Sequence, residues 1–289
     1  MYDIGFIGFG EAAQAFVDSW KANGVDLRIC AWDILLDDAR TRADKLNDCA
    51  SRQVHTATSA TDLASQANLL ICAVTASQVL QAARSVGSLP PDTLYLDINS
   101  VAPEKKKTAA ALIGDGYIDV AVLSPVHPLG VASPMLLAGP RVQAQTTRLT
   151  TLFGNAEVIS TEVGAASLVK MIRSIFVKGL ESITMECALA AHKSNLSTRV
   201  FPSLDNTLRF TQFKVLADYT MERVATHGIR RSEEMREVCD TLADLGLNNT
   251  MSAAAVQVQQ AIGDLHLADT MKPIPADSWQ IADAVFKLI

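Results

Sequence analysis

The chain has 289 residues, enough for about two domains of ordinary size, each with its own core. It is 49% hydrophobic and 19% charged, with a mean hydropathy of +0.18, yet no apolar run approaches the roughly 18 residues that a membrane span needs. The net charge of -6, with no basic run beyond Lys105-Lys106-Lys107, argues against a nucleic-acid or membrane surface. We read this lysine triplet as a solvated helix face.

The cysteines and the first residues of the chain indicate its environment. The five cysteines are odd in number and widely spread, and no Cys or His spacing suits a zinc site. We therefore expect reduced thiols and no metal. The opening Met-Tyr-Asp-Ile-Gly-Phe lacks the basic segment and cleavage site of a signal peptide. Both features predict a cytoplasmic protein.

A glycine-rich turn follows the first apolar run, residues 3–8, and precedes an amphipathic segment. This order of strand, turn and helix matters, because glycines alone also mark ordinary turns. The first glycine permits the tight turn, and the second lets the backbone approach a pyrophosphate at the helix N-terminus. The predicted cofactor contacts in this turn are Gly8, Phe9, Gly10, Glu11 and Ala12.

A second apolar run, residues 27–32, ends at Asp33. An acid at this position accepts hydrogen bonds from ribose hydroxyls and repels a 2′-phosphate, which favours NAD over NADP. Arg40 and Arg42 follow and could serve a phosphate instead, although a solvated helix is their simpler interpretation. We therefore expect NAD as the cofactor and keep NADP open.

Further apolar runs at residues 68–74, 93–98 and 117–123 alternate with helical segments. This pattern predicts an α/β domain with a doubly wound parallel sheet. We also expect a short edge strand at 134–139 and a last strand at 156–159. Ligands of such sheets gather at the carboxyl ends of the strands. The candidate positions there are Val74, Thr75, Asn99, Ser100 and Ser124, with helix capping by Ser77 and Ser100 as a compatible alternative.

One long helix is predicted over residues 164–193, with the domain boundary near Thr161, giving domains 1–161 and 162–289. At about 100° per residue, its polar residues share one side and its apolar residues share the other. The polar stripe is Ser167, Lys170, Arg173, Ser174, Lys178, Glu181 and Thr184. The plain interpretation is a solvated face with a Lys178–Glu181 pair; the alternative is a functional stripe.

The second domain is predicted to be all-helical, since no convincing strand follows residue 193. We expect one helix from Asp205 or Asn206 to His227-Gly228, and others over 232–246, 249–265 and 278–288. Wide apolar faces, notably residues 251–262, indicate a subunit interface and hence a homodimer.

Four blocks together resemble the β-hydroxyacid dehydrogenases, which include 3-hydroxyisobutyrate and 6-phosphogluconate dehydrogenases: residues 5–10, 97–103, 119–122 and 164–170. The resemblance implies an N-terminal Rossmann domain that binds NAD(P), an all-helical domain, and a cleft for a small-molecule substrate. It also implies that Lys170 is the catalytic acid/base. An amine in a dry cleft can have its pKa lowered enough to accept the proton of an alcohol.

The chain departs from the family pattern at several points. Ser174 stands where an asparagine is usual, Leu123-Ser124-Pro125 replaces Ser-Gly-Gly, and Glu233-Glu234-Met235 replaces Lys-Asp-Leu, with Arg230 and Arg231 as substitutes for the missing charge. These departures indicate a divergent 6-phosphogluconate-dehydrogenase-like branch. The candidate substrate contacts are Asn99, Ser100, Ser124, Arg173, Ser174 and Lys178, of which Arg173 and Lys178 suit a carboxylate.

The expected activity is hydride transfer between NAD(P) and a small β-hydroxy acid or related alcohol. One alternative is an imine reductase or reductive aminase, because these enzymes resemble the same family but commonly carry another residue where Lys170 stands. The other alternative is a non-catalytic dinucleotide-binding sensor. The lysine favours alcohol and carbonyl chemistry.

Overall fold

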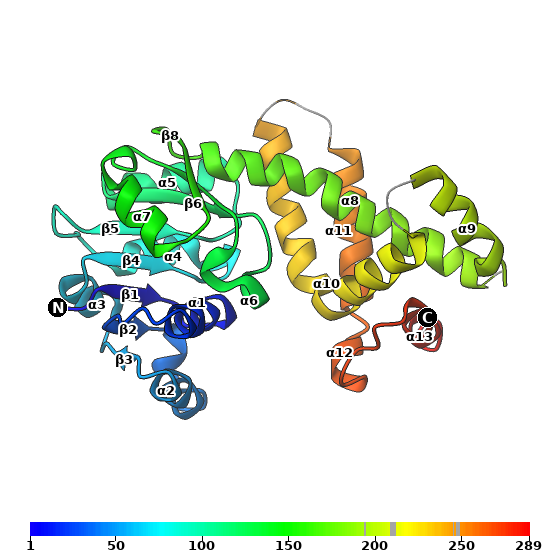
Figure 1. Cartoon of the computed structure of the whole chain (residues 1–289), viewed down its shortest axis with the longest axis horizontal. Coiled ribbons are helices and arrows are strands. Elements are labelled where there is room, and N and C mark those ends of the chain that lie inside the picture. The colour runs from blue at the N-terminus through cyan, green and yellow to red at the C-terminus, as the bar shows by residue number, and fades with distance from the viewer. Residues whose placement is uncertain (194, 209–211, 245, 247–248) are drawn as a thin grey trace. The chain divides into compact units, whose positions relative to one another are not determined.

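The computed structural model describes residues 1–193, 195–208, 212–244, 246 and 249–289. The chain divides into two compact units, Met1–Met171 and Ile172–Ile289, and the division falls inside one long helix (Figure 1). These units are defined by how compactly the residues pack, not by what they bind. The limits 1–161 for a cofactor domain and 162–289 for a substrate domain therefore stay a prediction.

The first unit contains one sheet in the order β3-β2-β1-β4-β5-β6-β7-β8. Its strands are β1 (Ile4–Ile7), β2 (Ile29–Trp32), β3 (His55–Thr56), β4 (Leu69–Cys72), β5 (Leu94–Asp97), β6 (Tyr117–Val122), β7 (Met135–Ala138) and β8 (Ala156–Ser160). Every neighbouring pair is parallel except β6 and β7. The predicted doubly wound sheet is confirmed. The strand predicted at 134–139 is confirmed as β7, but its predicted place at the edge of the sheet is wrong, because β8 pairs with the outer side of β7.

Helices cover both faces of this sheet. They are α1 (Glu11–Ala22), α2 (Arg42–Ser51), α3 (Ala60–Gln66), α4 (Val79–Ser85), α5 (Pro103–Ile113), α6 (Val126–Leu129) and α7 (Thr146–Leu152). Successive strand residues point to opposite faces. In β4, Leu69 and Ile71 therefore join one core cluster, and Leu70 and Cys72 join the other. Burial on both faces explains why β1 and β4 are short continuous apolar runs.

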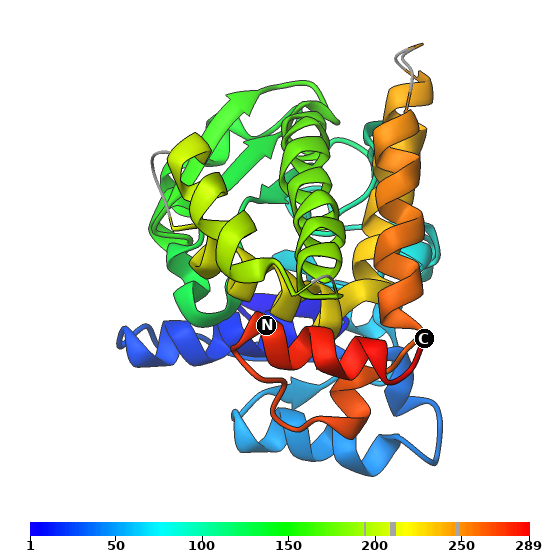
Figure 2. The ribbon, with the colours of Figure 1, turned by 90° about the vertical axis from the view of Figure 1, so that its right-hand side faces the viewer.

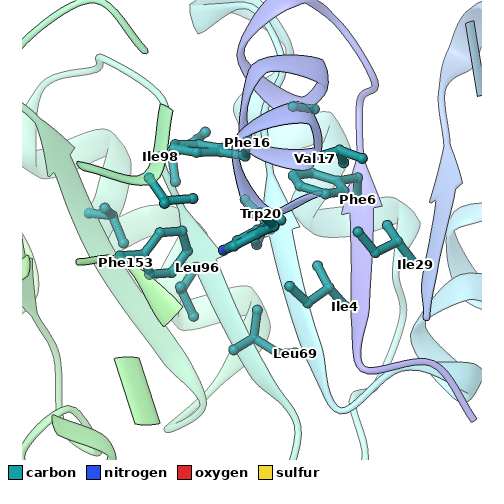
Figure 3. Close-up of a cluster of buried hydrophobic side chains, with 14 of the residues drawn as sticks. Ile4, Phe6, Phe16, Val17, Trp20, Ile29, Leu69, Leu96, Ile98 and Phe153 are labelled. Carbon is teal, nitrogen blue, oxygen red and sulfur yellow. The ribbon is translucent and has the colours of Figure 1, made fainter. Parts of the chain in front are cut away.

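Aromatic side chains fill the core between α1 and the sheet. Figure 3 shows Phe16 and Trp20 of α1 beside Ile4 and Phe6 of β1, with Phe153 near Trp20. The Trp20 ring centroid lies 5.9 Å from that of Phe16 and 5.8 Å from that of Phe153. Trp20 Nε1 donates a hydrogen bond of 2.9 Å to the Leu152 carbonyl, so its polar atom is satisfied. This packing fixes α1 behind the glycine turn.

The described part of the second unit contains only helices, which confirms the all-helical prediction. They are the remainder of α8 (Ala165–Lys193), then α9 (Ser197–Leu208), α10 (Phe213–Asp244), α11 (Thr250–Gly263), α12 (Leu267–Thr270) and α13 (Ser278–Phe286). The predicted long helix is confirmed as α8. Asp205 lies inside α9 rather than at a helix start, so that prediction is wrong.

The predicted end of a helix at His227-Gly228 is instead a kink within α10, where His227 has φ -126 and ψ 15. Helices α10 and α11 lie side by side in both views (Figures 1 and 2). A Cβ at Gly228 would lie 2.5 Å from the Gln259 carbonyl oxygen, and one at Gly263 would lie 2.5 Å from the Ile229 nitrogen. These two glycines let the helix backbones touch, which holds the kinked segment against α11.

Of the helices that the structure describes, none combines the length and the apolar composition that crossing a membrane requires.

Candidate functional site

The glycine turn lies between β1 and α1 and has the geometry of a phosphate-binding turn. Gly8 has φ +83, and a Cβ there would lie 2.4 Å from the Ala73 carbonyl oxygen, so only glycine fits. Gly10 is the residue before α1, and a Cβ there would meet no atom within 4 Å. The backbone at the N-terminus of α1 is therefore open to a ligand, and this fits the pyrophosphate of a dinucleotide.

Asp33 at the end of β2 holds this turn. Its Oδ2 accepts a hydrogen bond of 2.7 Å from the Phe9 N–H, and its Oδ1 accepts one of 2.9 Å from the Leu35 N–H. The Phe9 side chain is fully buried in the core. Of the predicted cofactor contacts, Phe9 thus offers backbone atoms only, whereas each Asp33 oxygen keeps a lone pair for a further donor.

Lys45 of α2 is a functional candidate that the sequence interpretation missed. Its Nζ donates a hydrogen bond of 2.9 Å to the Phe9 carbonyl and lies 2.9 Å from Asp48 Oδ2. The Phe9 backbone is therefore held at its N–H by Asp33 and at its carbonyl by Lys45. The signal in the sequence was the spacing of Lys45 and Cys49, because residues four apart share one helix face and the cysteine marks the buried face.

Asn99 joins the carboxyl ends of β4 and β5. Its Oδ1 accepts a hydrogen bond of 2.8 Å from the Val74 N–H. Its Nδ2 lies 3.2 Å from the Cys72 carbonyl and 2.7 Å from Asp97 Oδ1. The structure thus brings Asn99 and Val74 together, with Thr75 next in the chain. The Asn99 side chain is anchored to the protein at both ends, which leaves it little freedom to follow a substrate.

The capping alternative for the two serines is wrong. Neither α4, which begins after Gln78, nor α5, which begins after Ala102, has a side-chain cap. The Ser77 hydroxyl lies 3.1 Å from that of Thr75. The Ser100 hydroxyl accepts a hydrogen bond from the Lys170 ammonium. Of the predicted site residues, Ser100 and Lys170 are therefore in direct contact.

Ser124 follows β6, the neighbour of β5 in the sheet. Among the residues that the structure describes, its buried Oγ has no hydrogen-bond partner. A buried hydroxyl without a partner costs free energy. An oxygen or nitrogen of a bound ligand would satisfy it, so this atom fits the predicted role of Ser124 in lining a site.

Asp119 of β6 fixes the start of α8. Its Oδ2 accepts hydrogen bonds from the Gly164 N–H at 3.1 Å and the Ser167 N–H at 2.9 Å, and its Oδ1 accepts one of 2.5 Å from the Ser167 hydroxyl. Buried Lys106 lies 3.4 Å from the same Oδ1. The interpretation of the lysine triplet as a solvated face is therefore wrong for Lys106, because two buried aspartates need a cation beside them.

Five of the seven residues of the polar stripe of α8 are buried rather than solvated, whereas Lys170 is half-buried and Arg173 is exposed. Ser167, Ser174, Lys178, Glu181 and Thr184 are at most 7% exposed. The predicted Lys178–Glu181 pair is replaced by two pairs with α10.

In the first pair, Lys178 Nζ lies 3.0 Å from Glu234 Oε2. In the second pair, Arg231 Nη2 lies 2.6 Å from Glu181 Oε1. Burial raises the pKa of Glu181, and burial lowers the pKa of Arg231. Among the predicted substrate contacts, Ser174 Oγ accepts a hydrogen bond of 3.5 Å from Lys178, and Arg173 is exposed.

Two family descriptions match parts of the chain. Residues 3–100 match the family described as NADP oxidoreductase, coenzyme F420-dependent. Residues 191–262 match a domain of unknown function, DUF1932. The first match covers the glycine turn, Asp33, Asn99 and Ser100. It supports a nicotinamide dinucleotide as the cofactor.

Three relatives are similar over most of the chain. A conserved hypothetical protein from Sinorhizobium meliloti 1021 is 29% identical over 100% of this chain and 97% of its own, with a TM-score of 0.73. A conserved protein of unknown function, described as structurally similar to 3-hydroxyacid dehydrogenases, is 29% identical over 91% of this chain and 97% of its own, with a TM-score of 0.69. An uncharacterized 28.5 kDa protein of Methanothermus fervidus is 27% identical over 82% of this chain and 88% of its own.

Two enzymes share the fold at lower identity. A 3-hydroxyisobutyrate dehydrogenase of Mycobacterium tuberculosis is 15% identical over 99% of each chain, with a TM-score of 0.67. An imine reductase of Streptomyces aurantiacus is 18% identical over 98% of this chain and 99% of its own, with a TM-score of 0.53. The resemblance to the β-hydroxyacid dehydrogenase-like family is confirmed. Hydroxyacid dehydrogenases and imine reductases both occur on this fold.

Proposed function

We propose that the chain is an NAD(P)-dependent oxidoreductase that interconverts a small β-hydroxy acid, or a related alcohol, and its carbonyl form. The observation that carries the proposal is the hydrogen bond from the Lys170 ammonium to the Ser100 hydroxyl. This hydrogen bond places a titratable amine at the carboxyl end of β5. The glycine turn follows the carboxyl end of β1, on the same side of the parallel sheet. Ligands of open α/β sheets bind on this side.

The bound dinucleotide would supply the hydride chemistry, and the protein would supply alignment and proton transfer. A neutral Lys170 amine accepts the proton of the alcohol as the carbonyl forms. In the reverse direction its ammonium returns that proton to the oxygen. Ser100 orients the amine by accepting its hydrogen bond. Ser124 lines the pocket with a hydroxyl that has no partner among the described residues. Asn99 acts indirectly by fixing Val74 and the start of the Ser100 loop.

We assign the cofactor as NAD, with Gly8, Gly10, Glu11, Ala12, Val74 and Thr75 around it. Asp33 supports this choice. It follows the last residue of β2, and its carboxylate lies beside the glycine turn, where it repels a 2′-phosphate. Of the two alternative phosphate ligands, Arg40 and Arg42, the first already pairs with Asp38, with 2.7 Å between Arg40 Nη2 and Asp38 Oδ2.

We assign a carboxylate-bearing substrate, with Arg173 as its first partner. Arg173 is three residues after Lys170, about one helical turn along α8. Its guanidinium can bind a carboxylate through two hydrogen bonds. Ser174 follows on the same helix. Lys178 is a weaker candidate, because its ammonium is buried against Glu234.

The test is cofactor reduction by the wild type and the Lys170→Ala variant over β-hydroxy acids, sugar acids and aromatic alcohols, with NAD and NADP supplied separately. We expect turnover to fall by about 10²-fold or more in the variant, since general acid/base catalysis contributes about 10² to 10⁴. Cofactor affinity, measured by titration, should stay unchanged. The control is Lys21→Ala, which removes an exposed lysine at the far end of α1.

If the wild type reduced neither cofactor with any substrate of this panel, the proposal would be contradicted. Ketones supplied with amines, together with NADH or NADPH, test the imine-reductase alternative in the same assay. Tight cofactor binding with no turnover of any of these substrates would instead favour a dinucleotide-binding sensor. Loss of cofactor affinity and activity together in Lys170→Ala would indicate that the lysine has a structural role.

We also propose a homodimer that covers the apolar side of α8. Val169, Ile172, Phe176 and Ile183 are between 43% and 71% exposed and recur at spacings that share one helix face. Sedimentation analysis should give a dimer for the wild type and more monomer for Phe176→Ser. A wild type that sediments as a monomer at micromolar concentration would contradict this proposal.

A further inference from the structure

Four fully buried polar side chains of the first unit form one connected cluster: Asp97, Lys106, Tyr117 and Asp119. Lys106 Nζ lies 3.0 Å from Asp97 Oδ1 and 3.4 Å from Asp119 Oδ1. The Tyr117 hydroxyl donates a hydrogen bond of 2.6 Å to Asp97 Oδ2. Burial raises the pKa of Tyr117 well above its ordinary value, so it remains a donor. One ammonium therefore serves two carboxylates that solvent does not reach.

The carboxylate of Asp97 binds the backbone next to Ser100, and the carboxylate of Asp119 binds the first turn of the helix that carries Lys170. Asp97 Oδ1 accepts a hydrogen bond of 3.0 Å from the Asn99 N–H, and the next residue in the chain is Ser100. On the other side, Asp119 binds the N–H and the hydroxyl of Ser167. Lys170 is three residues later in the same helix, about one turn along. Lys106 thus links the two supports.

We propose that Lys106 is a positioning residue for Lys170, which acts by holding the end of β5 at a fixed spacing from the first turn of α8. The inference rests on the proposed function, because it gives Lys170 the role of acid/base. Without the Lys106 ammonium, the carboxylates of Asp97 and Asp119 repel each other, and a buried repulsion is relieved by separating the groups or by protonating one. Either change alters the support of the Lys170–Ser100 hydrogen bond.

The test is the titration of Lys170 by NMR of lysine-labelled protein without substrate, with its signal identified by its absence in Lys170→Arg. In Lys106→Met we expect the titration midpoint of Lys170 to move by about 0.5 pH unit or more, because the amine loses its fixed hydrogen bond. The matched control is Lys45→Met. It removes another buried lysine of the same unit, whose partners are Phe9 and Asp48, and it should leave this midpoint unchanged.

A second variant guards against misfolding of Lys106→Met. Ser167→Ala removes one hydrogen bond to Asp119 and no charge, so a smaller shift in the same direction is expected. An unchanged Lys170 midpoint in both variants, or an equal shift in Lys45→Met, would overturn the proposal. A structural role alone would lower the melting temperature without a selective change at Lys170.

The two proposals fail in different ways. The NMR titration needs no turnover, so a Lys170 signal that responds to Lys106 supports the positioning role even if no substrate of the panel reacts. Turnover that depends on Lys170, together with a midpoint that ignores Lys106 and Ser167, would support the oxidoreductase and overturn the positioning role.

Discussion

The two units of the chain bury their polar side chains in different ways. In the first unit, apolar residues fill both faces of the sheet, and buried charges gather near the carboxyl ends of its strands. In the second unit, α8 turns a polar stripe toward α10 and leaves Ile172, Phe176 and Ile183 exposed. The short continuous apolar runs of the strands therefore indicated the inside of the first unit. The amphipathic pattern of α8 does not, because ion pairs between helices decide which side faces inward.

The largest effect on stability is expected from the Glu181–Arg231 pair. Replacing Arg231 by Met leaves the Glu181 carboxylate buried without its cation, and the free energy of unfolding should fall by about 3–5 kcal/mol. Arg230→Met is the matched control. Arg230 is 58% exposed, and its partner Glu234 keeps a second cation, Lys178, so the loss of Arg230 should cost about 1 kcal/mol or less. Urea unfolding followed by circular dichroism measures both variants. Equal losses would remove the contrast between buried and exposed pairs.

The glycine turn should show a contrast of its own. Gly8→Ala forces a Cβ against the Ala73 carbonyl at positive φ, so the free energy of unfolding should fall by about 1–3 kcal/mol and cofactor binding should weaken. Gly10→Ala places its methyl group in open space and should change the free energy of unfolding by about 0.5 kcal/mol or less. It should nevertheless weaken binding of NAD, because the methyl group occupies the approach of the pyrophosphate.

Thermal unfolding and cofactor titration of the two glycine variants separate these effects. Full NAD affinity in Gly10→Ala would contradict the assignment of the N-terminus of α1 as the pyrophosphate site. Full stability of Gly8→Ala would contradict the geometry of the turn.

Most of the fold could be predicted from the sequence, because its signals are local. Short apolar runs between glycine turns and helices gave the strands of the first unit, and the 3.6-residue period gave α8. The position of β7 was missed, since pairing with β8 depends on segments distant in the chain. The single helix α10 was missed because Gly228 was interpreted as a helix end, whereas it is a contact point with α11.

Residues of the candidate site could be predicted where they belong to a sequence motif. They could not be predicted where their role depends on pairing with residues distant in the chain. The glycine turn, Asp33 and Lys170 stand out by motif or resemblance. Lys106 does not, because it belongs to a run of three lysines, and only its buried partners show its role. Lys45 has a weak signal, its spacing to Cys49, but its bond to the Phe9 carbonyl joins distant residues and could not be derived from that spacing. The pairing of Lys178 with Glu234 could not be derived either, since it joins residues 56 positions apart.

The pH dependence of stability tests how the helical unit tolerates its buried acid. Burial raises the pKa of Glu181 above its ordinary value. The folded state then binds its proton more tightly than the unfolded state does, so the stability from this group is present at low pH and is lost as pH rises through the folded pKa. Relative to the wild type, Glu181→Gln should therefore become more stable as pH rises from about 4 toward neutrality.

Urea unfolding of the wild type and Glu181→Gln at several pH values gives this difference. The difference cancels the opposite trend of surface acids such as Asp62, whose backbone hydrogen bond with Thr58 lowers its pKa. A difference that shrinks with rising pH would show that the ion pair with Arg231 outweighs the burial of Glu181.

The smallest effect is expected at the surface of the first unit, from Arg40. Its guanidinium is exposed and pairs locally with Asp38, two residues away. Arg40→Ala should leave the affinities for NAD and NADP unchanged, whereas Asp33→Asn should weaken NAD binding and favour NADP, because a carboxylate next to the ribose is removed. Cofactor titrations of both variants measure this. If Arg40→Ala weakened NADP binding by about tenfold, the exposed arginine rather than the buried aspartate would decide which cofactor the first unit takes.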